Sequence, residues 1–213
     1  MFVKRFIFNP IQVNTYLAID EKSKQCVLID AGCLEASEQE ELATYIRNHD
    51  LQLTHVLNTH LHLDHCFGNA FIYRTFGVGP EAHRDDENLL GILKAHAQMF
   101  GIDFNDDVQP LHGYLSEGDV ISFGESRLSV IHVPGHSRGG LAFYSESDKL
   151  LFSGDSLFKN SIGRTDLHGG NYRILVSNLI TKIMILPGET DVYPGHGDMT
   201  TIEDERLNNP YLQ

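Results

Sequence analysis

Residues 59–65 concentrate side chains that bind metal ions. They read T-H-L-H-L-D-H, so three imidazoles and one carboxylate follow directly on a short apolar run that predicts the end of a strand. Residues two apart in an extended segment point to the same side, which lets His60 and His62 bind one ion together. A turn beyond them would bring Asp64 and His65 to a second ion. Because zinc, iron and manganese accept imidazole and carboxylate ligands, the segment predicts a metal site rather than a histidine-rich surface loop.

Three later residues of ligand type share one local pattern. Each follows an apolar run and a glycine: His136 in V-P-G-H, Asp155 in F-S-G-D and His196 in Y-P-G-H. Glycine permits left-handed backbone angles and close approach of the chain, so each strand can turn sharply and present one side chain at a shared rim. The candidate metal ligands are therefore His60, His62, Asp64, His65, His136, Asp155 and His196.

Together these motifs resemble the metallo-β-lactamase fold superfamily, through T-H-x-H-x-D-H, P-G-H at 134–136, G-D at 154–155 and P-G-H at 194–196. Within it, the chain is similar over nearly its whole length to the short glyoxalase II-like, or hydroxyacylglutathione hydrolase-like, branch. The resemblance implies an α/β fold, an αββα sandwich of two mixed sheets with helices on the outer faces. It also implies that one ion is bound by His60, His62 and His136, the other by Asp64, His65 and His196, and that Asp155 bridges both. Lactam-hydrolysing relatives usually carry cysteine in that bridging position.

Strand and helix signals alternate in both halves of the chain. Strands are expected at 3–8, 15–19, 26–29, 55–58, 128–133, 141–144, 150–152 and 191–193, and helices at 35–48, 67–76, 87–100, 171–185 and near the C-terminus. Residues 101–114 are expected to form a loop beside the site. Hairpins that give way to helices suit two sheets with helices outside and ligands on loops along one edge. Periodicity alone does not select this layering; the family resemblance does.

Composition bounds the class of protein. A chain of 213 residues can bury a core without disulfides, and its cysteines, Cys26, Cys33 and Cys66, are odd in number and form no C-x-x-C pair. We interpret Cys66 as a small buried residue. Without a signal peptide or an apolar run of about eighteen residues, the chain is expected to be soluble, cytoplasmic and free of membrane contact. We expect one domain over residues 1–213, with no C-terminal glutathione-binding helical domain.

The formal net charge is −13, from 16 basic and 29 acidic residues. Such a surface repels polyanions, so a nucleic-acid partner is not expected, although some relatives of this fold are nucleases. The acidic runs at 38–41 and 85–87 are interpreted as solvated helix faces and helix N-terminal turns. The oligomeric state stays open.

The other histidines divide into two groups. His132 lies four residues before His136 and could support the ligands from behind, while His168 could line the mouth of the pocket. The resemblance gives Asp30 a hydrogen-bonding support role. Surface or core roles are expected for His49, His55, His83, His96 and His112.

The ligand set predicts a metal-dependent hydrolase. We expect two divalent ions, zinc by preference, with iron or manganese as alternatives. They would lower the pKa of a shared water and supply a metal-bridging hydroxide. Asp64 can orient this hydroxide and is the predicted catalytic residue. A thiolate leaves with little protonation because thiol pKa values lie near about 8.5, whereas an amide needs a general acid and none stands out. We therefore predict a thioesterase of glyoxalase II type, acting on S-lactoylglutathione-like or other small thioesters.

Substrate recognition leaves alternatives open. Arg164 could bind a substrate carboxylate or instead form a structural ion pair with Asp166, and Lys159 is a further candidate for substrate binding. The segment 163–166 and the chain ending look equally like persulfide dioxygenases, which implies an iron-dependent oxidoreductase as the alternative function. A non-catalytic metal-binding module is a third hypothesis; seven ligands argue against it, since a structural site is usually closed by four.

Overall fold

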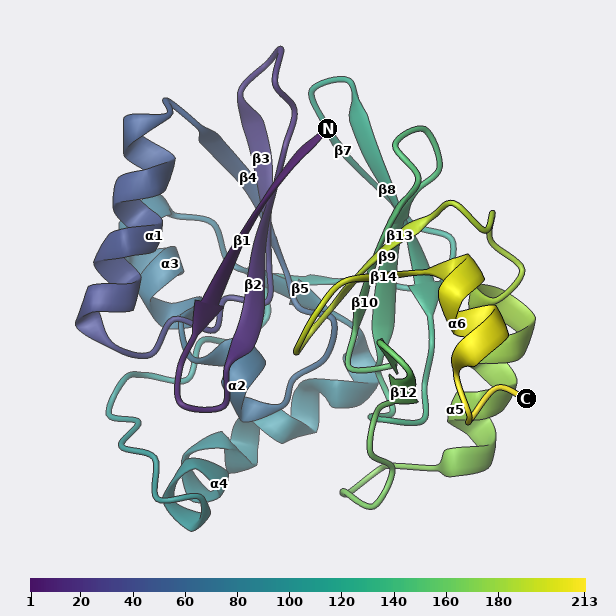
Figure 1. Ribbon diagram of the computed structural model, residues 1–213. Coiled ribbons are helices and arrows are strands. Elements are labelled where there is room, and N and C mark those ends of the chain that lie inside the picture. The colour runs from purple at the N-terminus through teal and green to yellow at the C-terminus, as the bar shows by residue number, and fades with distance from the viewer.

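Two six-stranded sheets pack face to face, and helices cover their outer faces (Figure 1). The computed structural model describes residues 1–213; strands up to Tyr114 form the first sheet, and later strands form the second, apart from a separate two-stranded hairpin. Both sheets mix parallel and antiparallel pairs. The predicted αββα sandwich is therefore confirmed.

The first sheet begins as an antiparallel meander and continues with parallel strands. In spatial order its strands are β1 (Phe2–Phe8), β2 (Val13–Ile19), β3 (Gln25–Ile29), β4 (Gln52–Leu57), β5 (Pro80–Ala82) and β6 (Gly113–Tyr114). Helix α1 (Ala36–Asn48) makes the crossover from β3 to β4, and α3 (Asn69–Phe76) lies between β4 and β5. Parallel strands need such crossovers, which places these helices on the outer face.

The second sheet mirrors this plan with its own helices. Its spatial order is β14 (Thr200–Thr201), β13 (Asp191–Pro194), β10 (Leu150–Gly154), β9 (Leu141–Ser145), β8 (Ser126–His132) and β7 (Val120–Phe123). Between β10 and β13 the chain forms the small hairpin β11 (Leu157–Phe158) and β12 (Ser161–Ile162), then α5 (Tyr172–Asn178) and the π-helical turn η2 (Leu179–Ile183). Helix α6 (Ile202–Asn208) ends the fold.

Alternation along β2 shows how the core is layered. Tyr16 points between the sheets, where its ring lies 5.4 Å from that of Phe152 in β10. Its neighbour Leu17 belongs to the layer under α1, with Leu42 and Ile46. Successive strand residues face opposite sides, so a strand covered on both faces is apolar throughout rather than at every second position.

Four strands end at the edge that carries the predicted ligands. β8, β10 and β13 run in the same direction, and Thr59, just beyond β4, accepts a hydrogen bond from Leu141 N at 2.7 Å. The glycines directly before Asp155 and His196 are required because a side chain at either position would collide with neighbouring atoms. A Cβ at Gly154, whose φ is +50°, would collide with the Thr59 side chain, and a Cβ at Gly195 would collide with the Asp155 carboxylate.

Several predicted elements differ in detail. The helix expected at 67–76 is present as α3, and a short helix, α2 (Leu63–Cys66), precedes it where a turn was expected. The helix expected at 87–100 is a 3₁₀ helix, η1 (Arg84–Ile92), followed by α4 (Leu93–Met99). Gly91 lowers helix propensity at that junction. The strands β5 and β6 were not predicted, because three and two residues are too few to show alternation. No helix has the length and apolar character needed to cross a membrane.

The buried carboxylate of Asp20, just beyond the end of β2, links the two sheets through hydrogen bonds. Asp20 accepts hydrogen bonds from Ser23 N and Oγ, both at 2.8 Å, and from Ser126 Oγ at 3.0 Å in the β7–β8 hairpin. These bonds, those from Ser23 foremost, hold the pKa of Asp20 well below its usual value. The resulting stabilisation is present above about pH 4 and is lost as the pH falls below that value.

Asp20→Ala is therefore expected to lower the free energy of unfolding by about 1–3 kcal/mol at pH 7, because several donors lose their acceptor. Urea unfolding measures this, and the difference from the wild type should shrink at low pH. The exposed neighbour Glu21, which makes no side-chain hydrogen bond, supplies the control Glu21→Ala. Equal stability of the two variants would contradict the linking role of Asp20.

Candidate metal centre

The seven predicted ligands converge at the edge where the strands end. Their donor atoms form three overlapping groups, each with all atoms within 4.8 Å of one another. The groups are His60, His62 and His136; Asp64, His65 and His196; and His60, His65 and Asp155. The first two have the same members as the two ion sites that the family resemblance implied, and each joins segments more than seventy residues apart.

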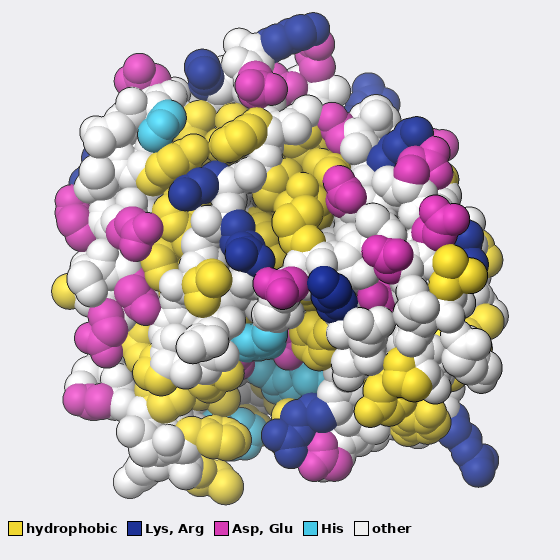
Figure 2. Space-filling view, in the orientation of Figure 1, with side chains coloured by type: hydrophobic (Ala, Val, Ile, Leu, Met, Phe, Trp, Pro, Cys, Tyr) yellow, Lys and Arg dark blue, Asp and Glu magenta, His cyan; other side chains and the backbone are white.

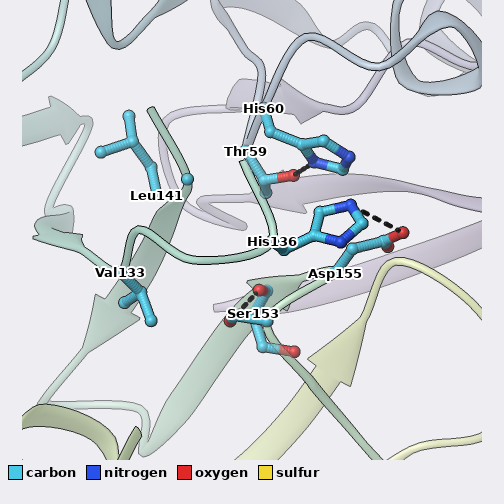
Figure 3. Close-up of a pocket in the computed structure, with 9 residues that line it drawn as sticks. Thr59, His60, Val133, His136, Leu141, Ser153 and Asp155 are labelled. Atoms are coloured by element: carbon cyan, nitrogen blue, oxygen red, sulfur yellow. Dashed lines mark hydrogen bonds and ion pairs between the residues drawn. The ribbon is translucent and has the colours of Figure 1, made fainter. Parts of the chain in front are cut away.

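Asp155 lies between the two main groups. Its Oδ2 is 3.6 Å from Nε2 of both His136 and His196, and its Oδ1 is 3.4 Å from His65 Nε2. Figure 3 shows the His136 ring and the Asp155 carboxylate directed toward each other, with His60 beside them. This carboxylate therefore faces donors of both groups.

In three of the histidine rings, Nδ1 points away from the cluster toward an oxygen atom. His136 Nδ1 donates to Arg164 O at 2.8 Å, and His196 Nδ1 donates to Gln12 O at 3.1 Å. His60 Nδ1 lies 3.1 Å from Thr59 Oγ1 (Figure 3). With each outer nitrogen protonated, the Nε2 lone pair faces the cluster, as in histidines that bind metals.

Three buried atoms at the centre have no hydrogen-bond partner: His60 Nε2, His65 Nε2 and Asp155 Oδ1. Buried polar atoms are normally satisfied, and these three face one another rather than solvent. A divalent cation would satisfy them, since imidazole nitrogen and carboxylate oxygen are its usual protein ligands. The donor set therefore fits a metal ion on geometry and chemistry alike.

Electrostatics in the first group favours neutral rings. Burial holds the pKa of His60 well below its usual range, with His65 nearby adding to the effect. Burial and the adjacent His136 lower the pKa of His62 to about 3. These rings therefore stay unprotonated at neutral pH, which is the form that binds metals.

The second group carries an excess of negative charge. Burial opposes protonation of His65, but Asp64, Asp30 and Asp155 outweigh it and raise the pKa of His65 well above its usual value. Three carboxylates around one imidazole create a site for positive charge. A bound cation would replace that proton, because a ligating histidine must be neutral.

Asp30 supports the ligand loop from beneath, as the family resemblance implied. Its carboxylate accepts hydrogen bonds from Thr59 N and Oγ1, both at 2.8 Å, and its Oδ2 lies 3.0 Å from His65 Nδ1. Asp30 is buried and adopts a φ of +54°, which only a few non-glycine residues tolerate. The strained backbone directs one carboxylate to both ends of the histidine-rich segment.

Asp86 is a further support that the sequence did not reveal. The interpretation of 85–87 as solvated is wrong for Asp86, which is only 1% exposed. Its carboxylate accepts hydrogen bonds from Gly139 N at 2.6 Å, Ser137 Oγ at 2.7 Å and Leu61 N at 3.4 Å. Leu61 stands between two ligand histidines and Ser137 directly follows a third, so Asp86 ties together two segments of the first donor group.

Asp86→Ala is expected to weaken metal binding by about 10- to 100-fold, because both segments lose their shared anchor. Competition with a chromophoric chelator measures the affinity. The matched control is Asp85→Ala at the neighbouring exposed carboxylate, which should bind metal like the wild type. If Asp86→Ala lost stability while keeping full affinity, its role would be confined to the fold.

The remaining predicted residues are distributed around this centre. His132 stacks on His83 at 4.1 Å and contacts Arg138 O, so it borders the loop after His136 without reaching the donors. Cys66 is buried, and burial raises the pKa of its thiol well above the usual value, as suits an inert residue. Lys159 is exposed and does not line the cleft that opens over the donors.

A cleft of about 510 Å³ opens over the donors, within the range of small-molecule sites. Figure 2 shows histidine side chains in a hollow in the lower half of this face, beside hydrophobic side chains. Arg164 and the predicted His168 line it, and so does His96, for which a surface or core role was expected. Arg164 Nε and Nη2 pair with the two carboxylate oxygens of Asp166, each at 2.8 Å.

An αββα sandwich with histidine and aspartate donors at one edge defines a class of metal-binding hydrolases. Residues 8–196 match the model of the metallo-beta-lactamase superfamily, and the chain belongs to that family. It is 35% identical over 202 residues to the hydroxyacylglutathione hydrolase GloC of Haemophilus influenzae, covering 94% of this chain and 93% of that one. The predicted family is therefore confirmed.

Solved structures show the same fold at full length. The BLEG-1 B3 metallo-beta-lactamase superposes with a TM-score of 0.90 at 33% identity, and TTHA1623 in a di-iron-bound form with 0.85 at 34%; both alignments cover 100% of each chain. ETHE1 from Myxococcus xanthus gives 0.80 at 26% identity, covering 99% of this chain and 84% of that one. The fold is therefore shared by relatives with different names, among them a hydroxyacylglutathione hydrolase and a B3 metallo-beta-lactamase.

Proposed function

We propose that this protein hydrolyses small thioesters in the manner of glyoxalase II, with two divalent ions held by the seven clustered side chains. The observation that carries the proposal is the position of Asp155, whose carboxylate faces donors of both groups at 3.4–3.6 Å. The similarity to a hydroxyacylglutathione hydrolase over 94% of the chain supports the thioester class.

The chemistry divides between the ions and the protein. Divalent ions bound there would lower the pKa of a water molecule and polarise a carbonyl group. Asp64 lines the cleft, and its Oδ2, 3.1 Å from His196 Nε2, can accept a hydrogen bond that orients the attacking water. A thiolate leaves as a weak base, so hydrolysis proceeds without a general acid.

Zinc is the metal that we propose, since neutral imidazoles and carboxylates suit it and it needs no redox partner. Iron is the alternative because TTHA1623, 34% identical, is described in a di-iron-bound form. With iron, the second candidate function is that of a persulfide dioxygenase. Oxygen uptake with glutathione persulfide by an iron-loaded sample would favour it.

A substrate panel tests the main proposal. Rates on S-lactoylglutathione, a lactone, a β-lactam and a phosphodiester are compared in one buffer after metal analysis of the purified protein. We expect the thioester to be hydrolysed fastest. A β-lactam belongs in the panel because BLEG-1 is named for that activity, and a clear preference for it or for the phosphodiester would overturn the proposal.

Removal of metal is expected to abolish thioester hydrolysis while the fold persists, because four apolar clusters stabilise the two sheets independently of the donors. Dialysis against a chelator, followed by circular dichroism and assay, measures both effects. Restored activity on adding zinc or iron would identify the competent metal. Full activity in a metal-free sample would contradict the metal requirement.

A further inference from the structure

The wall of the cleft beside the donors is largely apolar. Leu63 and Leu89 are buried in it, and Phe158 is partly buried. At the end of α4, Met99 is 80% exposed and Phe100 is 61% exposed, and both line the cleft. Large apolar side chains exposed together next to a chemical site mark a surface that binds a ligand.

The same cleft has little positive charge with which to bind an anionic substrate. Arg164 is its only lysine or arginine, and two of its three guanidinium nitrogens, Nε and Nη2, donate to the carboxylate of Asp166, each at 2.8 Å. Asp64 and Asp155 add negative charge to the floor, and the chain as a whole carries −13. A metal pair would balance the negative charge of the floor, but the one guanidinium of the wall would still have its charge neutralised by Asp166.

We propose that the cleft selects thioesters whose acyl group is a neutral apolar chain of several carbons. The carbonyl would lie over the donors, and the chain would extend along Leu89, Met99 and Phe100. Methionine is flexible and polarisable, so such a wall accepts chains of different length. This inference rests on the proposed thioesterase function and specifies its substrate class.

The test uses acyl thioesters of one neutral thiol, N-acetylcysteamine, with acyl groups of two to eight carbons. Each methylene that becomes buried adds about two- to fourfold in affinity, so kcat/KM is expected to rise steadily with chain length. The octanoyl compound is also expected to exceed S-lactoylglutathione in kcat/KM. A second readout is calorimetric binding of the matching S-alkyl thioethers, which cannot be hydrolysed and should bind with a negative heat-capacity change.

In the double variant Met99→Ser and Phe100→Ser, kcat/KM for the thioesters and affinity for the thioethers are both expected to depend much less on chain length. The metal content of this variant should match that of the wild type, because neither side chain is among the metal donors. Ile185 and Leu207 are 72% and 67% exposed and lie outside the cleft, so Ile185→Ser with Leu207→Ser is the matched control. The control variant should retain the full dependence on chain length.

The possible outcomes separate this inference from the proposed function. Hydrolysis of every thioester at one rate, with no gain in thioether binding, would overturn the apolar selection and leave the thioesterase intact. Thioether binding that rises with chain length, with no hydrolysis of any thioester, would support the apolar wall and overturn the thioesterase. A chain-length dependence in the double variant as steep as that in the control would also contradict the assignment of the wall.

Discussion

Asp155→Ala is expected to lose both ions and to lower thioester hydrolysis by about a hundredfold or more. Asp155 is the one residue whose carboxylate approaches both main donor groups, with Oδ2 at 3.6 Å from His136 and His196 and Oδ1 at 3.4 Å from His65. Without it, the imidazoles on either side would have no shared counter-charge. Elemental analysis of protein purified without added metal measures the loss directly.

Two controls make this result specific. Asp198→Ala removes an exposed carboxylate two residues beyond His196, and it should keep wild-type metal content. Asp155→Asn preserves the volume of the side chain, so it separates loss of charge from a packing defect. Circular dichroism establishes that each variant is folded, and a folded Asp155→Ala protein with both ions would refute the bridging assignment.

Local motifs were sufficient to find the side chains that converge on the metal centre. His60 and His62 follow β4 within five residues, and the glycines before His136 and Asp155 mark strand ends that can turn sharply. The topology then brings these ends together, because β8 and β10 run in the same direction within one sheet. A motif of this kind encodes its geometry within a few residues, and the family resemblance supplies the layering.

Features built from distant segments could not be found in that way. In the sequence, Asp86 resembles any acidic residue in the first turn of a helix. Its carboxylate nevertheless accepts hydrogen bonds from Ser137 and Gly139, more than fifty residues away. The exposed pair Met99 and Phe100 could likewise not be linked to the site from sequence, because only the fold brings them into the same cleft as the donors. Sequence periodicity shows where apolar residues recur, but it does not show which distant residues line the same cleft.

Arg164 makes two contacts that bear on its predicted roles. Its guanidinium pairs with Asp166, as one of the two alternatives held, while its backbone carbonyl accepts the hydrogen bond from His136 Nδ1. The residue therefore orients a ligand histidine through its main chain, and its side chain is engaged elsewhere. Arg164→Ala should keep its metal content, because the carbonyl remains.

Asp64→Asn is expected to abolish most turnover, by about a hundredfold or more, while the three-histidine group keeps its ion. The substitution retains the size and one donor oxygen but removes the charge that faces His65 and His196 at 3.5 and 3.1 Å. The second ion should therefore bind more weakly. Titration of the variant with zinc, with metal content and kcat measured at each step, separates ligation from catalysis.

The outcome of that titration distinguishes two roles of one carboxylate. If saturating zinc restores both full occupancy and wild-type kcat, Asp64 serves only as a ligand. If occupancy returns and kcat stays low, the carboxylate also orients the attacking water, which is the result that we expect because Asp64 both lines the cleft and belongs to the second donor group. Should Asp64→Asn remain fully active without added zinc, the reacting water would have to lie elsewhere in the cleft, and the proposed placement of the reaction would be wrong.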